Sequence, residues 1–250
     1  MGRLLLVGNS RWHWAQRQPN GLRVWHEAGP PVGSGPDQWC DLEAWACVGR
    51  LSAALALPED RRIGLAQVPL QQLPPWLGVD RALVGWRAWR CQGQAVLVAD
   101  AGTCLSLTCI DGQGRFRGGR LSAGLALQLR SLGLATAQLP DLLEPLAELS
   151  RAAELQSSPS ASDWPVETAD AMIQGCLRAC AAAVAQAWRE RCSDDESWAL
   201  WLTGGDATLL EPLLRQQGIA SVLAPDLAVE ALAELAKLAQ GKGFSPDPGR

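Results

Sequence analysis

The 250-residue chain has no tyrosine, only two histidines and no excess of positive charge. The missing tyrosine removes one common hydroxyl from the catalytic candidates. A formal net charge of −4 argues against a nucleic-acid partner, because phosphate backbones bind to basic surfaces. No apolar run approaches the roughly 20 residues of a membrane span. The apolar start, Leu4–Val7, is too short for a signal sequence. We therefore expect a cytoplasmic protein without a membrane partner.

The eight cysteines include no C-x-x-C pair, and neither His13 nor His26 has zinc-ligand spacing. Cys176 and Cys180 stand one helical turn apart, which suits a metal or a disulfide. Without a ligand motif, buried free thiols in a reducing compartment explain the cysteines better, so we assign them to packing. They are Cys40, Cys47, Cys91, Cys104, Cys109, Cys176, Cys180 and Cys192.

Twelve tryptophans are spread along the chain. Trp12 and Trp14 alternate, as on one face of a strand, and Trp86 and Trp89 are three apart, as on one face of a helix. In an acidic chain, packing explains these side chains better than the stacking of nucleic-acid bases.

The first 93 residues are predicted to form an N-terminal α/β lobe. The tight turn Gly8–Arg11 joins its first two strands, and Pro36 is placed to open a helix. The predicted strands are 4–7, 12–16, 22–25 and 62–68, and the predicted helices are 37–47 and one that begins after Gly78.

The strand–strand–strand–helix order then restarts, which predicts a second lobe of the same fold over residues 94–250. Asp111–Gly114 is the predicted hairpin turn between its second and third strands. The predicted strands are 94–99, 104–110, 115–121, 198–202 and 222–224. The predicted helices are 123–138, 166–192, 207–217 and 227–239, with a loop over 156–165 and a disordered tail over 241–250.

Two buried-strand patterns end in small polar turns. Asp100-Ala101-Gly102-Thr103 follows the apolar run 95–98, and Thr203-Gly204-Gly205-Asp206 follows the apolar run 198–202. Glycines allow the backbone to approach a phosphate, the N–H groups of the turn point at the anion, and an acid at the strand end can hold the accompanying cation. Two such turns predict a nucleotide held at both ends, and so a phosphoryl-transfer enzyme.

Six short motifs follow one another along nearly the whole chain. They are Gly8-Asn9-Ser10-Arg11, Gly78-Val79-Asp80-Arg81, Asp100-Ala101-Gly102-Thr103, Gly118-Gly119 with Gly124, Thr168 with Ala171 and Gly175, and Thr203-Gly204-Gly205-Asp206. Each motif alone is weak, but in this order they resemble the type III pantothenate kinases. That resemblance implies two ribonuclease-H-like lobes of the actin and sugar-kinase superfamily. It also implies ATP-dependent phosphorylation of pantothenate to 4′-phosphopantothenate, the first step of coenzyme A biosynthesis.

The reacting hydroxyl is a poor nucleophile at neutral pH, so a carboxylate is needed as general base. The resemblance gives this role to Asp80 and substrate contacts to Gly78, Arg81 and Thr168. Arg81 would steady the substrate carboxylate or the transferring phosphoryl group. Helix capping is the alternative for Asp80 and for Thr168, and a surface ion pair is the alternative for Arg81.

The resemblance also assigns the nucleotide contacts. It implies one phosphate loop of Gly8, Asn9 and Ser10, an opposing loop with Gly102 and Thr103, and a cation-binding role for Asp100. A helix opened by Gly204, Gly205 and Asp206 would lie near the adenosine end. Family members are similar in using Mg²⁺ with ATP and a monovalent cation, K⁺ or NH₄⁺, and in forming homodimers.

Two positions depart from the family's pattern. The first loop usually carries an aspartate two residues before its Gly-Asn pair, where this chain has Leu6, followed by Val7. Loss of one electrostatic element costs on the order of 10²–10³-fold in rate, and Asp206 and Asp111 are candidate replacements. Ala123 stands where the family has proline. Two alternatives stay open, namely a catalytically weakened nucleotide-binding protein that acts through a partner and a kinase for another small hydroxyl substrate.

Overall fold

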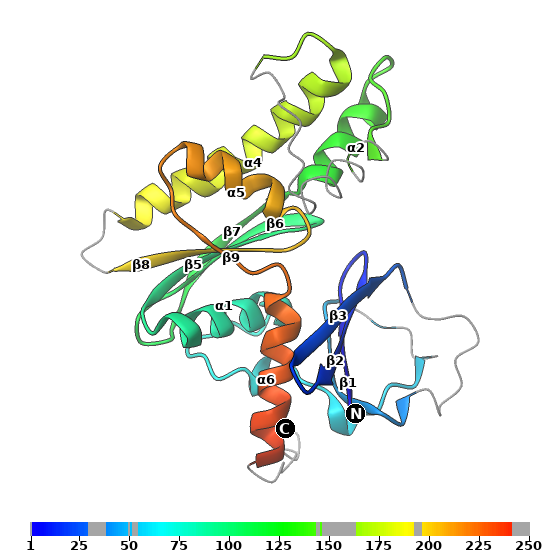
Figure 1. Ribbon diagram of the computed structural model, residues 1–250, viewed down its shortest axis with the longest axis vertical. Helices are drawn as coiled ribbons and strands as arrows, with labels where there is room; N and C mark the ends of the chain where they lie inside the picture. Colours follow the sequence, from blue (N-terminus) through cyan, green and yellow to red (C-terminus); the bar gives the residue numbers. More distant parts are fainter. Residues whose placement is uncertain are drawn as a thin grey trace. The chain divides into compact units, whose positions relative to one another are not determined.

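The computed structural model describes residues 2–29, 39–49, 51, 55–143, 146, 164–192 and 197–241. They form an α/β protein with two compact units. The first unit is Met1–Cys91, Gly114–Phe116 and Asp226–Arg250, and the second is Gln92–Gln113 and Arg117–Pro225. Each unit has its own sheet (Figure 1). The lobe boundaries expected from the sequence, 1–93 and 94–250, stay a prediction, and most of the predicted tail and of the 156–165 loop lies outside the described residues.

The sheet of the first unit has the strand order β3-β2-β1-β4. Its strands are β1 (Arg3–Val7), β2 (Trp12–Gln18), β3 (Gly21–Glu27) and β4 (Leu42–Cys47). The first three are antiparallel neighbours, whereas β4 runs parallel to β1. One face packs against α1 (Val79–Gln92) and α6 (Leu227–Gly241) in a shared apolar core.

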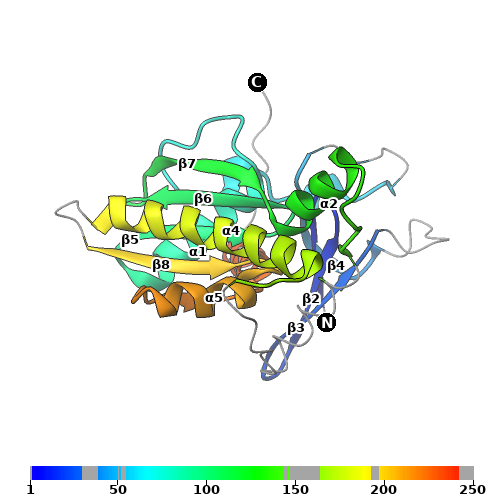
Figure 2. The same cartoon turned by 90° about the horizontal axis from the view of Figure 1, so that it is seen from above.

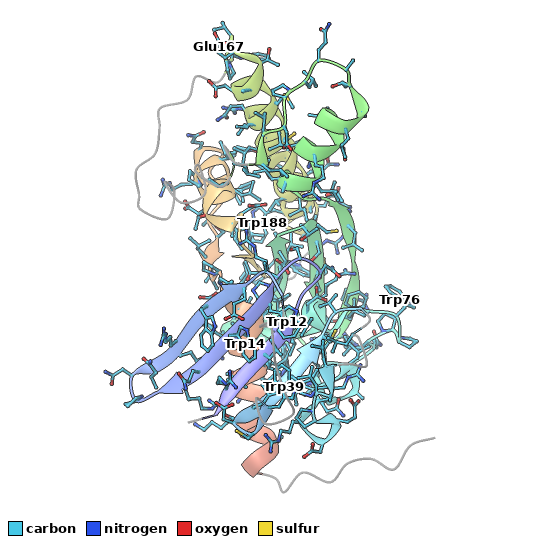
Figure 3. The ribbon with its side chains drawn as sticks, turned by 90° about the vertical axis from the view of Figure 1, so that its right-hand side faces the viewer. Trp12, Trp14, Trp39, Trp76, Glu167 and Trp188 are labelled. Carbon is cyan, nitrogen blue, oxygen red and sulfur yellow. The ribbon has the colours of Figure 1, made fainter. Side chains whose placement is uncertain are left out.

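The opposite face of this sheet carries a tryptophan cluster. Trp12, Trp14 and Trp39 lie together (Figure 3), with ring centroids 6.2–6.4 Å apart. Trp25 stacks on Trp14 at 5.9 Å. The predicted strand face of Trp12 and Trp14 is therefore confirmed, and Trp86 is likewise buried on the inner face of α1.

Two predicted elements of this unit are wrong. Residues 42–47 form strand β4 instead of the end of a helix, and residues 62–68 contain the second of two 3₁₀ helices, Glu59–Arg61 and Leu65–Gln67, instead of a strand. Leu, Glu and Ala favour a helix locally, but pairing with β1 buries Leu42, Ala44 and Ala46, and such tertiary packing overrides propensity.

The second unit contains a five-stranded sheet of order β7-β6-β5-β8-β9 (Figure 2). The strands are β5 (Ala95–Ala101), β6 (Cys104–Ile110), β7 (Phe116–Ala123), β8 (Trp198–Thr203) and β9 (Val222–Leu223). Helices α2 (Leu125–Ala135), α4 (Thr168–Cys192) and α5 (Ala207–Gln216) contribute to one core with β5, β6 and β8. Because β5 and β8 are parallel, their carboxyl ends meet at one edge, with Asp100 opposite Thr203.

The cysteines are all free thiols, and Cys176 and Cys180 are buried as expected. The packing assignment is wrong for the exposed residues Cys40, Cys91, Cys104 and Cys192, of which the last three lie at or near element ends. Within the described residues, no group of three or more His, Cys, Asp or Glu side chains is arranged to hold a metal. None of the described helices is both long enough and apolar enough to span a membrane.

Candidate active site

The two small polar turns of the second unit lie against each other. Asp100 and Thr203 are neighbours in the parallel β5–β8 pair, and the Asp206 N–H donates to the Ala101 carbonyl at 2.9 Å. The turn after β5 and the turn after β8 therefore lie side by side at one edge of the sheet, joined by this backbone hydrogen bond. This is the edge at which open α/β sheets bind ligands.

Gly204 lies where the two turns are in close contact, and only glycine fits at this position. Its φ is +88°, and a Cβ would lie 2.5 Å from both the Ala101 carbonyl oxygen and Asp100 Oδ1. Gly124 closes the other side, where a Cβ would overlap the Gly102 carbonyl oxygen, and its N–H donates to the Thr103 carbonyl at 3.0 Å. Three backbone segments thus pack without intervening side chains beside the Asp100 carboxylate.

We call these three backbone segments, which are the turn after β5, the turn after β8 and Gly124, the cradle. Helix α5 begins at the cradle. Asp206 occupies the N-cap position without a capping side-chain hydrogen bond, and the helix has ten residues, so its partly positive end is available to an anion. Thr208, in the first turn, has a buried Oγ1 with no hydrogen-bond partner among the described residues. The sequence pattern did not single out Thr208, because a threonine in a first helical turn carries no motif.

Asp80 lies in the first turn of α1 in the first unit. The Gly78 carbonyl accepts a hydrogen bond from the Ala82 N–H at 3.2 Å, so Gly78 is the N-cap and Asp80 the second helical residue. Asp80 Oδ1 is buried without a hydrogen-bond partner among the described residues. Burial raises the pKa of Asp80, opposed by the backbone N–H and charge of Arg81. A carboxylate whose ionised form is disfavoured by burial is a better base than an exposed one.

Gly78 and Arg81 are the neighbours of Asp80 in the chain that we expected to contact the substrate. A Cβ at Gly78 would overlap Asp80 Oδ1 in its present position, so glycine leaves room for this orientation of the carboxylate. Arg81 is 8% exposed, with its guanidinium 6.0 Å over the Phe116 ring, so it is not the exposed partner of a surface ion pair.

Thr168 is the first residue of α4 in the second unit, and it is exposed. The N-cap position belongs to Glu167 (Figure 3), whose carbonyl accepts a hydrogen bond from the Ala171 N–H at 2.9 Å. Thr168 is therefore placed just inside the helix instead of at its cap.

The first loop connects β1 to β2. The Gly8 N–H donates to the Arg11 carbonyl at 3.0 Å, and Asn9 and Ser10 are exposed at the tip. Leu6, buried in the core of the first unit, is paired across the strands with His13.

Of the two candidate replacements for the missing first-loop acid, Asp111 is far from the cradle. In the antiparallel β5–β6 pair, Asp100 is opposite Ser106 while Val96 is opposite Ile110, so Asp111 lies at the other end. There its Oδ1 accepts a hydrogen bond from the Gln113 N–H at 3.0 Å, as a turn residue does. Asp206 lies at the cradle itself.

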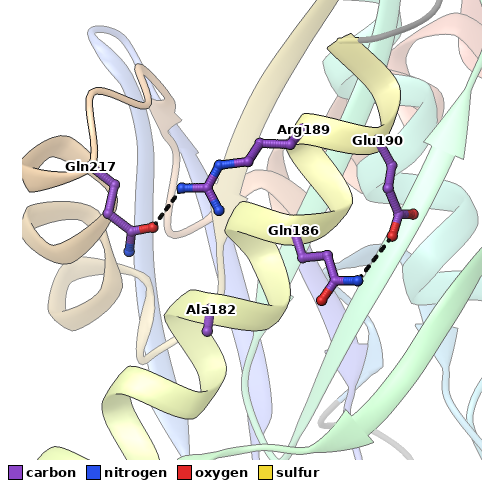
Figure 4. Close-up of a pocket in the computed structure, with 5 residues that line it drawn as sticks. All are labelled: Ala182, Gln186, Arg189, Glu190 and Gln217. Carbon is purple, nitrogen blue, oxygen red and sulfur yellow. Dashed lines mark hydrogen bonds between the residues drawn. The ribbon is translucent and has the colours of Figure 1, made fainter.

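A surface pocket lies elsewhere on the second unit (Figure 4). It is lined by Ala182, Gln186, Arg189, Glu190 and Gln217, none of them predicted site residues. Arg189 Nη2 donates to Gln217 Oε1 at 2.9 Å, and Gln186 Nε2 donates to Glu190 Oε1 at 3.3 Å. The polar side chains of this pocket form hydrogen bonds in pairs, so few of their donors and acceptors are available to a ligand.

Comparison with known proteins identifies the family of the chain. The family model described as type III pantothenate kinase matches residues 66–190. A type III pantothenate kinase of Synechococcus elongatus is 32% identical over 99% of this chain and 100% of its own. One from Thermosynechococcus vestitus is 33% identical over 84% of this chain and 80% of its own.

Solved structures share the fold at low sequence identity. A Campylobacter jejuni protein named for the Baf family of transcriptional activators has a TM-score of 0.59 at 16% identity, covering 96% of this chain and 99% of its own. A Sinorhizobium meliloti protein named as a 2-dehydro-3-deoxygalactonokinase has a TM-score of 0.53 at 17% identity, covering 97% and 99%. The predicted α/β fold class is confirmed, and these two solved structures share the fold.

Proposed function

Because the chain belongs to the type III pantothenate kinase family, we propose that it transfers the γ-phosphoryl group of ATP to the primary hydroxyl of pantothenate. This reaction begins coenzyme A biosynthesis. The observation that carries the proposal is 32% identity to a type III pantothenate kinase over 99% of the chain.

Asp80 is the proposed general base. Its Oδ1 is buried and unused by the described residues, and burial raises its pKa, so proton uptake from a hydroxyl is more favourable than for an ordinary aspartate. Gly78 leaves the space that this carboxylate occupies, and Arg81 is the proposed partner of the substrate carboxylate or the transferring phosphoryl group. Thr168 is the proposed further pantothenate contact.

The cradle of the second unit is the proposed phosphate site. Gly102 and Thr103 line one turn, Gly204 and Gly205 line the other, and Asp206 opens α5. Magnesium binds to hard oxygen ligands and neutralises phosphate charge, and the Asp100 carboxylate beside Gly204 fits that preference. Gly8, Asn9 and Ser10 form the proposed phosphate loop of the first unit.

Three further features belong to the same proposal. A monovalent cation, K⁺ or NH₄⁺, is the expected additional activator, and the cytoplasm is the expected location. A homodimer is supported by exposed apolar side chains on and near α2, because monomers rarely leave such a patch uncovered. These are Leu121, Leu127, Leu132 and Leu134.

The two alternatives make different predictions. A weakened nucleotide-binding protein would bind ATP without turnover, and Leu6 at the usual aspartate position favours it. Asp80 opposes it, because its Oδ1 is buried with no hydrogen-bond partner among the described residues, and burying a carboxylate costs stability. A kinase for another compound would prefer a different hydroxyl acceptor.

The test is ADP release by the purified protein with Mg²⁺, ATP and pantothenate, with and without K⁺. Release that depends on pantothenate and rises with K⁺ supports the proposal. ATP binding without release would contradict it in favour of the weakened protein. Release with another member of a panel of small hydroxyl compounds, and none with pantothenate, would show a different acceptor.

A further inference from the structure

Ser106, in strand β6 of the second unit, has a buried hydroxyl that the fold does not use. The residue is 6% exposed, and its Oγ has no hydrogen-bond partner among the described residues. A buried hydroxyl in a folded protein ordinarily bonds to protein, to an ordered water or to an ion, because an unmatched hydroxyl costs free energy. Ser106 Oγ therefore marks a place where a ligand or a water belongs.

The register of the sheet places Ser106 beside Asp100. The two residues are directly opposite each other in the antiparallel β5–β6 pair, so their side chains project from the same face, with Cβ atoms about 4.5–5.5 Å apart in such pairs. Leu105 and Leu107, on either side of Ser106 in the chain, pack on the opposite face in the core of the second unit. The face with Asp100 thus carries a carboxylate and an unused hydroxyl on neighbouring strands.

Thr203 lies on the other side of Asp100, but its hydroxyl is already engaged. It is paired with Asp100 in the parallel β5–β8 pair and is 2% exposed. Its Oγ1 donates a hydrogen bond to the Pro225 carbonyl at 3.2 Å. Of the two hydroxyls that flank Asp100 in the sheet, Ser106 is therefore the one that remains for a ligand of the Asp100 carboxylate.

We propose that Ser106 is a positioning residue, whose Oγ accepts a hydrogen bond from a water molecule on the divalent cation that Asp100 holds for ATP. The proposal rests on the proposed function, which assigns that cation to Asp100. The chemistry of the pair fits, because Mg²⁺ takes oxygen ligands and keeps several of its waters, which have protons to donate. Both oxygen-bearing side chains lie on adjacent strands of one sheet, so their pairing does not depend on the first unit.

The first test is the stability of Ser106→Ala without nucleotide or metal. Because Oγ has no partner among the described residues, its removal should leave the thermal unfolding temperature unchanged or raise it. A marked decrease would show that the fold itself uses the hydroxyl, and would overturn the proposal.

The second test is the Mg²⁺ dependence of ATP binding, measured by calorimetry without pantothenate. Ser106→Ala should raise the Mg²⁺ concentration needed for half-maximal ATP binding by about tenfold, as loss of a group that orients a metal's ligands does. Ser106→Thr keeps the hydroxyl and should recover most of that loss. With EDTA in place of Mg²⁺, the parent protein and both variants should bind ATP equally.

A double-mutant cycle shows whether Ser106 and Asp100 act on the same cation. In the Asp100→Asn protein, the further change Ser106→Ala should cost about twofold or less, because the cation has already lost its carboxylate. Trp201→Phe is the matched control. Trp201 lies on the same face, opposite Val98, and its Nε1 is also buried without a partner among the described residues, but an N–H cannot accept a hydrogen bond. This variant should keep the Mg²⁺ dependence of the parent.

The outcomes separate this proposal from the kinase assignment. The parent Mg²⁺ dependence in Ser106→Ala, or the same tenfold loss in the Asp100→Asn background, would exclude the role of Ser106 even when pantothenate is phosphorylated normally. If the Mg²⁺ dependence changes as expected but no pantothenate is phosphorylated, the acceptor assignment fails and the role of Ser106 stands. A parent protein that shows no Mg²⁺-dependent ATP binding would exclude both.

Discussion

At the scale of single residues, burial accounts for the chemistry of Asp80. A carboxylate in the first turn of a helix is ordinarily exposed and stabilises the helix through the dipole. Here Oδ1 is buried without a partner among the described residues, and burial raises the pKa of Asp80. Gly78 holds the N-cap position, so Asp80 is not the N-cap residue, although its carboxylate accepts a hydrogen bond from the Arg81 backbone N–H. Burial of the carboxylate costs folding free energy and suits the proposed role of Asp80 as a base.

Asp80→Asn should lower kcat by about 10²–10⁴-fold, because the amide cannot accept the hydroxyl proton. ATP affinity, measured by calorimetry, should stay near that of the parent protein. Normal kcat in this variant would remove Asp80 as the base.

The same substitution should stabilise the protein at pH 7. Since the folded-state pKa of Asp80 is raised, its ionised form is disfavoured by folding, and this cost appears as the pH rises through that pKa. The cost is absent below the ordinary aspartate pKa. Denaturant unfolding should therefore show Asp80→Asn more stable than the parent at pH 7, with the difference vanishing near pH 3. A loss of stability at pH 7 that disappears near pH 3 would instead indicate that the ionised carboxylate stabilises the helix.

At the scale of elements, the parallel pairing of β5 with β8 makes the candidate phosphate cradle. The Asp206–Ala101 hydrogen bond and the close approach of Gly204 join the two turns. Gly124, at the start of α2, closes the cradle from the third side. The strand ends thus position backbone groups beside the Asp100 carboxylate.

Gly204→Ala should weaken ATP binding strongly and destabilise the fold by about 1–3 kcal/mol, because φ is +88° and the methyl group would meet Ala101 and Asp100. Gly205→Ala is the matched control, since no described atom lies within 4 Å of its Cβ position. ATP affinity by calorimetry and thermal unfolding check both variants. Equal behaviour of the two alanines would contradict the proposed close approach.

At the scale of the whole molecule, the chain divides its apolar residues between two units and leaves some uncovered. Each sheet packs into its own core, yet α2 buries only Leu125 and Leu129 in the second unit. Leu134 is 82% exposed on the same helix. Uncovered apolar side chains of this kind favour self-association.

Leu134→Glu combined with Leu132→Glu should convert the proposed homodimer to a monomer, because charges would be placed in the buried interface. Val222→Glu, at an exposed apolar position of β9 in the same unit, is the control and should stay dimeric. Light scattering after gel filtration measures the mass. A parent protein that is already monomeric would exclude the dimer.

Much of the fold could be predicted because its signals are local. Strand β6 has the bounds predicted for it, and α4 begins two residues after its predicted start, since alternation and helical periodicity depend on neighbours in the chain. Strand β4 could not be predicted, because Leu, Glu and Ala suit a helix until β1 pairs with them. The candidate site residues were proposed from motifs, whereas Thr208 carries no motif and was found only from the burial of its Oγ1.

The sequence by itself determined the order of strands and helices in the second unit, the two glycine turns and the family. These depend on residue spacing and on the backbone freedom of glycine, which act over a few residues. Only the tertiary structure decided that Asp80 is buried, that Asp111 lies away from the cradle and that His13 lies beside Leu6. Burial and cross-strand contact arise between residues far apart in the chain, so local spacing cannot encode them one by one.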